Sequence, residues 1–262
     1  MSEPLSGRVA VITGSTSGIG LAIATGLAEA GASVMLNGFG EPAAIEAARA
    51  AVAASGAKAG YNGADMTRPA QIEELIAAAT SELGAVDILV NNAGIQHVAP
   101  VQTFPGEQWE RIIAINLSAA FYASKAALPQ MLERNWGRII NIASAHGLVA
   151  SANKSAYVAA KHGIVGLTKV LALETALTGV TCNAICPGWV LTPLVEKQIR
   201  ARAEAEGKTF EAAKLELVSE KHPSREFVTP AQLAAMALFL CSSGADQIRG
   251  QAYAIDGGWT AQ

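Results

Sequence analysis

The chain has 262 residues, a formal net charge of −3 and 51% hydrophobic residues. This length suits one or two domains with a sizeable core, and the absence of a basic patch argues against a nucleic-acid-binding protein. The polar start and the short apolar runs predict neither a signal peptide nor a stretch long enough to span a membrane, so we expect a cytoplasmic protein.

Short apolar strands alternate with helices along the whole chain. The pattern predicts strands at 9–12, 33–36, 86–90, 138–142, 180–185 and 251–255, and helices up to Ala30 and at 42–54, 69–83, 155–176 and 230–240, with one or two more in 108–131. This alternation is typical of a parallel sheet covered by helices on both faces. We therefore predict an α/β, Rossmann-like, doubly wound parallel sheet of about seven strands.

No linker, repeat or low-complexity segment divides the chain, so we predict a single domain over residues 1–262. Three cysteines are present, Cys182, Cys186 and Cys241, in apolar surroundings without a neighbouring histidine. Such cysteines are expected to be buried free thiols and not metal ligands or disulfide partners, so we predict no metal site.

A glycine-rich turn follows the first predicted strand. Residues 13–20 read T-G-S-T-S-G-I-G and lead directly into an alanine-rich helical stretch. In a strand–turn–helix context, glycines let the backbone approach a pyrophosphate, and the helix N-terminus offers unpaired N–H groups. The spacing is G-x-x-x-G-x-G and not the commoner G-x-G-x-x-G, but the turn still predicts a dinucleotide site.

A tyrosine and a lysine share a predicted helix face farther along the chain. Tyr157 and Lys161 are four residues apart, and Ser144 stands thirteen residues before the tyrosine. Residues i and i+4 lie on one helix face, so the ammonium group is expected to lower the pKa of the phenol. A tyrosine adjusted in this way can exchange a proton with an alcohol or a carbonyl oxygen.

Together these motifs resemble the short-chain dehydrogenases/reductases over nearly the whole chain. The matching stretches are 13–20, Asn91-Asn92-Ala93-Gly94, Asn116, Ser144, Tyr157-x-x-x-Lys161, and Pro187-Gly188 followed by Thr192. The resemblance implies an NAD(P)-dependent oxidoreductase with Asn116, Ser144, Tyr157 and Lys161 as catalytic residues. It implies that the tyrosine is the acid/base, the serine holds the substrate oxygen, the lysine binds the nicotinamide ribose and the asparagine helps hold a relay water.

The resemblance also implies a set of cofactor-binding residues that follow the predicted strands. They are Gly14, Ser15, Thr16, Ser17, Gly18, Ile19, Gly20, Phe39, Asp65, Asn92, Ala93, Gly94, Tyr157, Lys161, Pro187, Gly188, Val190 and Thr192.

The end of the second predicted strand bears on the choice between NAD and NADP. It reads Asn37-Gly38-Phe39, with neither the carboxylate that binds ribose hydroxyls nor a cation for a 2′-phosphate. Without such a cation NAD is favoured. Asn37 would bind a ribose hydroxyl and Phe39 would shield the adenine ribose, while Asp65 would contact the adenine or simply cap a turn near Thr67.

Four polar residues near the catalytic motifs favour a small carboxylate substrate. Lys154 and a protonated His146 would supply positive charge, and Gln96 and Gln198 would add hydrogen bonds. Each also has a plain structural interpretation, such as a solvated loop lysine or a turn-capping histidine. Trp189 and Trp259 would bound a small apolar pocket, although Trp259 could instead pack at an interface.

Within the family, this polar set is similar to that of members that oxidise (R)-3-hydroxybutyrate to acetoacetate with NAD. The alternatives are a 3-ketoacyl-thioester reductase, a sugar dehydrogenase or, more remotely, an NAD-binding regulator without turnover. The resemblance further implies a substrate lid at about 188–222 and a homotetramer.

Overall fold

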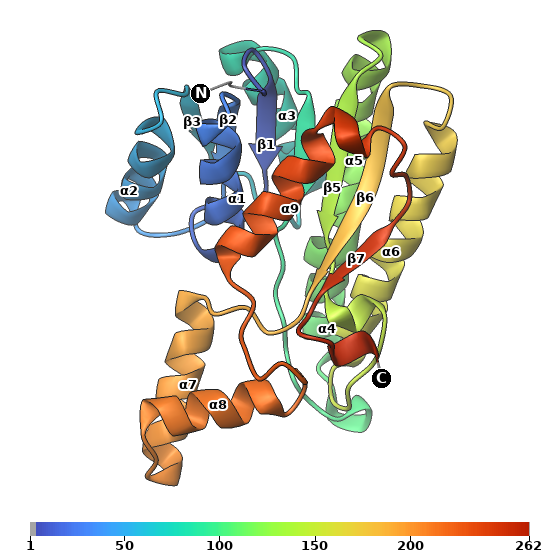
Figure 1. The fold of residues 1–262 in the computed structure, drawn as a ribbon. Coiled ribbons are helices and arrows are strands. Elements are labelled where there is room, and N and C mark those ends of the chain that lie inside the picture. The colour runs from blue at the N-terminus through green and yellow to red at the C-terminus, as the bar shows by residue number, and fades with distance from the viewer. Residues whose placement is uncertain (1–3, 262) are drawn as a thin grey trace.

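The computed structural model describes residues 4–261 and, at Leu194, the backbone alone. Within these residues, seven strands pair in parallel in one sheet with the order β3-β2-β1-β4-β5-β6-β7 (Figure 1), which confirms the predicted α/β doubly wound fold. The strands are β1 Val9–Ile12, β2 Ser33–Asn37, β3 Ala59–Asn62, β4 Ile88–Asn91, β5 Gly137–Ile142, β6 Val180–Pro187 and β7 Ala252–Ile255. The strand order reverses between β1 and β4, which is where such sheets bind their ligands.

Helices cover both faces of the sheet. Successive side chains of each strand point to opposite faces, so the apolar strands present a surface to be buried on each side. Ala10 and Ile12 face a core shared with α1 (Gly18–Glu29) and α9 (Pro230–Cys241), and α2 (Pro42–Ala53) adds Val52 to it. Val11 faces the second core. That core is formed with α3 (Pro69–Leu83), α5 (Ala119–Glu133) and α6 (Ser155–Glu174).

The predicted helical stretch 108–131 is divided in the structure. Helix α4 (Gly106–Ile113) passes into a π-helical turn, Ala114–Ser118, before α5 begins, and Pro129 lies inside α5. The π turn contains the predicted catalytic Asn116. Single π turns inside helices occur frequently at functional sites.

Strand β3 is absent from the sequence prediction. Its residues, Ala-Gly-Tyr-Asn, lack the β-branched run of the central strands, and all four are half-buried. The strand forms at the sheet edge because it pairs with β2, with Val34 opposite Ala59 and Asn37 opposite Asn62. Tertiary pairing therefore determines this strand more than its own sequence does.

Two further helices, α7 (Pro193–Glu206) and α8 (Phe210–Ser219), project beyond the carboxyl ends of the strands (Figure 1). They fall within the predicted lid but were not predicted as helices. The α7–α8 unit has a small core of its own around Ile199, Ala203 and Ala213. Whether this unit moves as a lid stays a prediction.

Two helical stretches, Gly106–Glu133 and Ser155–Glu174, are long and apolar enough to cross a membrane by length and composition alone. The expectation that no stretch reaches this length is therefore wrong. In the fold, α5 and α6 contribute to the second core against the sheet, and this packing accounts for their apolar content. The three cysteines are buried free thiols, as predicted.

Candidate active site

The glycine turn after β1 lies at the strand-order reversal, against the loop that follows β4. Gly14 has a φ of +61°, and a Cβ there would lie 2.8 Å from the Cα of Ala93. The Asn92 side chain donates to the carbonyl oxygens of Thr13 and Gly14, at 2.9 and 2.8 Å. These contacts fix the glycine turn as a narrow backbone loop next to the start of α1, which we call the glycine cradle. The first N–H groups of a helix have no intrahelical partner, so they are available to a phosphate.

Asn37 at the end of β2 does not have the predicted role. Its buried side chain donates from Nδ2 to the carbonyl oxygens of Asn62 and Ala64, and its Oδ1 accepts from the Gly14 N–H at 3.2 Å. The prediction that it binds a ribose hydroxyl is wrong, because both ends of the amide already bind backbone groups. The residue instead ties the glycine turn to the β2–β3 edge of the sheet.

The other predicted cofactor residues gather along the same edge of the sheet. Ser15 is buried and donates from its hydroxyl to the Ile12 carbonyl, whereas Phe39 is 67% exposed. Asp65 accepts two hydrogen bonds from Thr67, from the N–H and from the hydroxyl, and the backbone bond is the main cause of its lowered pKa. The turn-capping interpretation of Asp65 is thus confirmed, and its contact with adenine stays a prediction. Val190 has its side chain in the first core.

Three of the four predicted catalytic residues meet where β5 ends beside α6. Ser144 follows β5, and Tyr157 and Lys161 lie on α6. The Lys161 ammonium is buried and donates to the Ile142 carbonyl at 2.7 Å. That bond directs the lysine toward the carboxyl end of the sheet.

Asn116 joins the same region from the π turn. Its Oδ1 accepts from the Ile95 N–H at 2.9 Å, and its Nδ2 donates to the Ile95 carbonyl at 3.0 Å. The side chain therefore fixes the loop after β4, next to Gly94. Because the side chain is occupied, a water at Asn116 would have to bind its main chain, within the irregular backbone of the π turn.

Burial dominates the ionisation of the tyrosine–lysine pair. It raises the pKa of Tyr157, while the hydrogen bond with Ser144 acts in the opposite direction. Burial also lowers the pKa of Lys161 to about 8. The Lys161 Nζ lies 5.6 Å from the centre of the Tyr157 ring. The expectation that Lys161 lowers the pKa of Tyr157 is thus wrong among the protein's own groups, because both side chains have left water.

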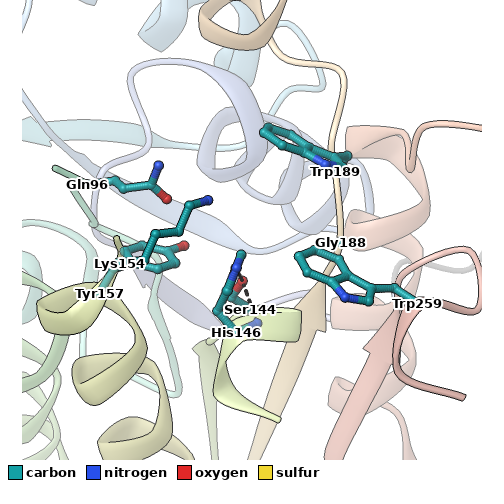
Figure 2. A pocket seen from close by; sticks show the side chains of 8 residues that line it. All are labelled: Gln96, Ser144, His146, Lys154, Tyr157, Gly188, Trp189 and Trp259. Carbon is teal, nitrogen blue, oxygen red and sulfur yellow. Dashed lines mark hydrogen bonds between the residues drawn. The ribbon is translucent and has the colours of Figure 1, made fainter. Parts of the chain in front are cut away.

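A cavity of about 100 Å³ opens beside the tyrosine. Figure 2 shows Gln96, Lys154 and Tyr157 on one side of it, the two tryptophans on the other, and Ser144 and His146 between them. The lining residues are Gln96, Ser144, His146, Lys154, Tyr157, Gly188, Trp189 and Trp259.

All predicted substrate residues except Gln198 line this cavity. Gln198 is exposed on α7, because the neighbouring Ile199 takes the inward position in the α7–α8 core. In this conformation the structure therefore does not bring Gln198 to the pocket.

His146 is a neutral side chain in the pocket wall. Burial, followed by the charges of Lys154, Lys221 and His162, lowers its pKa to about 4. Its Nε2 lies 3.0 Å from the Ser151 hydroxyl, and its ring packs edge-on against Trp259. The expectation of a protonated His146 is therefore wrong, since a buried imidazole between cations stays uncharged.

Two lysines supply the positive charge. The Lys154 Nζ lies 5.7 Å from the Trp189 ring centre, and the Lys221 Nζ lies 5.5 Å from that of Trp259. Burial and then the charge of Lys221 lower the pKa of Lys154. Sequence reasoning missed Lys221, which lies more than thirty residues from any catalytic motif and carries no local signal.

Comparisons with known proteins agree with this arrangement. The family model described as short chain dehydrogenase matches residues 8–203. The chain is 61% identical to the D-beta-hydroxybutyrate dehydrogenase of Cupriavidus necator over 98% of this chain and 100% of that protein. It is 55% identical to the enzyme of the same name from Rhizobium meliloti, over 97% and 99%.

Among solved structures, an actinorhodin polyketide ketoreductase variant crystallised with NADPH is 36% identical over the full length of both chains, with a TM-score of 0.91. The family match, the relatives and the shared fold lead to one conclusion: this chain is an oxidoreductase of the short-chain dehydrogenase family, which binds a nicotinamide dinucleotide.

Proposed function

We propose that this protein oxidises (R)-3-hydroxybutyrate to acetoacetate with NAD, reversibly. The observation that carries the proposal is Lys154, a half-buried cation in a small cavity that also contains Ser144 and Tyr157. A cation in partly dry surroundings needs an anionic partner, and a carboxylate provides one. The two relatives named D-beta-hydroxybutyrate dehydrogenase support the same substrate.

The pocket dimensions suit a four-carbon acid. A cavity of about 100 Å³ holds a small substrate, and the indoles of Trp189 and Trp259 present apolar surface for its methyl end. With Ser144 at the reacting oxygen, the carboxylate would face Lys154 and Gln96. Lys221, above the Trp259 ring, would add to the attraction without lining the cavity.

The proton would pass between substrate and Tyr157. In oxidation the phenolate oxygen takes the proton of the substrate hydroxyl, while Ser144 donates a hydrogen bond to the same oxygen. Lys161, held by Ile142, would bind the nicotinamide ribose, and the positive charge of the oxidised cofactor, when bound, would favour the phenolate. A bound nicotinamide would supply the acceptor for the hydride of the carbinol carbon.

The glycine cradle fits the pyrophosphate of this cofactor. A Cβ at Gly20 would collide with the Gly14 carbonyl and lie 2.8 Å from the Cα of Ser15, so only glycine allows this close turn. Gly14, Gly18 and Gly20 with the start of α1 would therefore bind the phosphates, and Phe39 would cover the adenine ribose.

Neutral groups around the end of β2 favour NAD over NADP. The Thr16 hydroxyl donates to the Phe39 carbonyl at 3.2 Å, and the Tyr61 hydroxyl donates to the Gly38 carbonyl at 2.7 Å. Neither group can neutralise a 2′-phosphate, which needs arginine or lysine.

The second candidate function is a 3-ketoacyl-thioester reductase. The shared fold of the solved ketoreductase with NADPH favours this function. The cation in the Lys154 pocket and the lack of a cation at the end of β2 argue against it. The test compares initial rates for NAD with (R)-3-hydroxybutyrate and for NADPH with an acetoacetyl thioester. A higher catalytic efficiency for the second pair would overturn the proposal.

We also propose a cytoplasmic homotetramer in which the α7–α8 unit closes over the substrate. Apolar side chains on the outer surfaces of α5 and α6 support the assembly, since Phe121, Val170 and Leu173 are 47%, 50% and 77% exposed. The position of α7 and α8 beyond the carboxyl ends of the strands supports the lid (Figure 1).

A further inference from the structure

Two chain segments connect the α7–α8 unit to the rest of the molecule. Residues 188–191 lead out from β6, and residues 226–229 lead back to α9; we call this pair the neck. The two segments pair in parallel at Val190 and Val228. The Val228 N–H donates to the Trp189 carbonyl at 2.9 Å, and the Leu191 N–H donates to the Val228 carbonyl at 3.1 Å. Trp189 therefore belongs both to the neck and to the pocket wall.

His222 links the two segments of the neck and is only 1% exposed. Its Nδ1 lies 2.8 Å from the Glu226 carbonyl oxygen, and its Nε2 lies 2.8 Å from the Trp189 backbone nitrogen. A carbonyl oxygen only accepts and a backbone N–H only donates, so Nδ1 carries the proton and Nε2 is the acceptor. The ring thus binds the outgoing segment with one nitrogen and the returning segment with the other.

The ring of His222 occupies a space that two glycines leave open. A Cβ at Gly188 would overlap its Nε2, and a Cβ at Gly257 would lie 2.8 Å from its Nδ1. Its ring centre is 6.3 Å from that of Trp259. One buried imidazole therefore contacts the main chain of Trp189 and lies beside Trp259, the two aromatic walls of the pocket.

We propose that His222 is a positioning residue for the substrate pocket. It is not among the residues that line the cavity. Its Nε2 fixes the Trp189 main chain, and the indole carried by that main chain faces Lys154. The effect on substrate binding rests on the proposed function, whereas the effect on the neck does not.

Three substitutions distinguish the roles of the two ring nitrogens of His222. His222→Gln keeps an acceptor at the position of Nε2, His222→Asn keeps a donor at the position of Nδ1, and His222→Phe keeps neither. We expect the Gln variant to hold the KM for 3-hydroxybutyrate within about threefold of wild type, and the Asn and Phe variants to raise it on the order of 10-fold. The KM for NAD should change little in all three.

Amide hydrogen exchange of the peptide over 186–192 gives a readout independent of activity. We expect faster exchange in the Asn and Phe variants than in the Gln variant and wild type, because the Trp189 N–H has lost its acceptor. Arg202→Gln is the matched control. Arg202 on α7 donates to Glu220, the residue that follows α8, at 2.7 Å. Its loss disturbs the unit but removes no hydrogen bond of the neck, so neither the KM nor the exchange rate should change.

Equal behaviour of the Gln and Asn variants in both readouts would overturn the proposal. Failure of all three variants to fold would also overturn it, since His222 would then serve stability alone. If the wild type did not oxidise 3-hydroxybutyrate, the proposed function would fail, but the exchange rates would still decide the role of His222 in the neck.

Discussion

Burial governs the ionisable side chains around the pocket. It is the largest cause of the shifted pKa values of His146, Lys154, Tyr157 and Lys161. The sequence spacing predicts which of these groups meet, but not their protonation, because spacing carries no information on solvent access. This is why the structure gathers the predicted pocket residues except Gln198 around one cavity, while the predicted charge of His146 is wrong.

Tyr157→Phe tests the proton-transfer role directly. The change removes the titrating hydroxyl from a half-buried ring and leaves the ring volume nearly unchanged. We expect the oxidation rate to fall by ~10²–10⁴-fold, with NAD binding, measured by fluorescence titration, close to wild type. Turnover near the wild-type value would remove Tyr157 from the mechanism.

His146 should make stability depend on pH. Its pKa is lowered from 6.5 to about 4 in the folded chain, so between these values the unfolded chain binds a proton that the folded chain does not. Above pH 6.5 this penalty is absent, and it grows as pH falls toward 4, to on the order of 3 kcal/mol. Thermal melting from pH 7.5 to 4.5 should show a smaller decrease in Tm for His146→Gln. An equal decrease would show that the imidazole is not buried as a neutral group.

Some elements are encoded in local sequence, and others depend on contacts across the fold. The central strands have apolar runs that identify them, whereas β3 forms only by pairing with β2. The α7–α8 unit packs mainly on itself, and its surface carries ion pairs such as Arg202–Glu220. The polar sequence of this unit lacks the apolar pattern that would predict its helices. The position of the unit, which keeps Gln198 away from the cavity, depends on the neck, and no local sequence pattern predicts the neck.

The turn after β2 offers a test of the preference for NAD over NADP. An arginine at Phe39, which is 67% exposed, can reach a 2′-phosphate without repacking the core. Gly38 is a poor choice, because its φ is +148° and a Cβ there would lie 2.8 Å from the Thr16 hydroxyl. We expect Phe39→Arg to raise catalytic efficiency with NADP relative to NAD by about 10-fold or more. An unchanged ratio in steady-state kinetics would show that this turn does not contact the ribose.

The outer faces of α5 and α6 carry exposed apolar side chains that the proposed tetramer would bury. Leu173 is 77% exposed on α6, with Val170 one turn earlier. Burying a leucine is worth roughly 2 kcal/mol, so a charged residue there should weaken the tetramer we propose. Light scattering should give about four chain masses for wild type and a smaller mass for Leu173→Glu. A wild-type mass of one chain would contradict the assembly.

Lys154 is the group through which we propose that the pocket recognises a carboxylate. The decisive measurement is catalytic efficiency for (R)-3-hydroxybutyrate and for its neutral methyl ester, in wild type and in Lys154→Met, which keeps the stem along Trp189 but loses the charge. We predict that wild type prefers the acid and that the variant loses on the order of 10- to 100-fold with the acid, mainly through KM, but less than about threefold with the ester. Equal losses for acid and ester would contradict carboxylate recognition by Lys154, because the lysine would then not bind the charged group of the substrate.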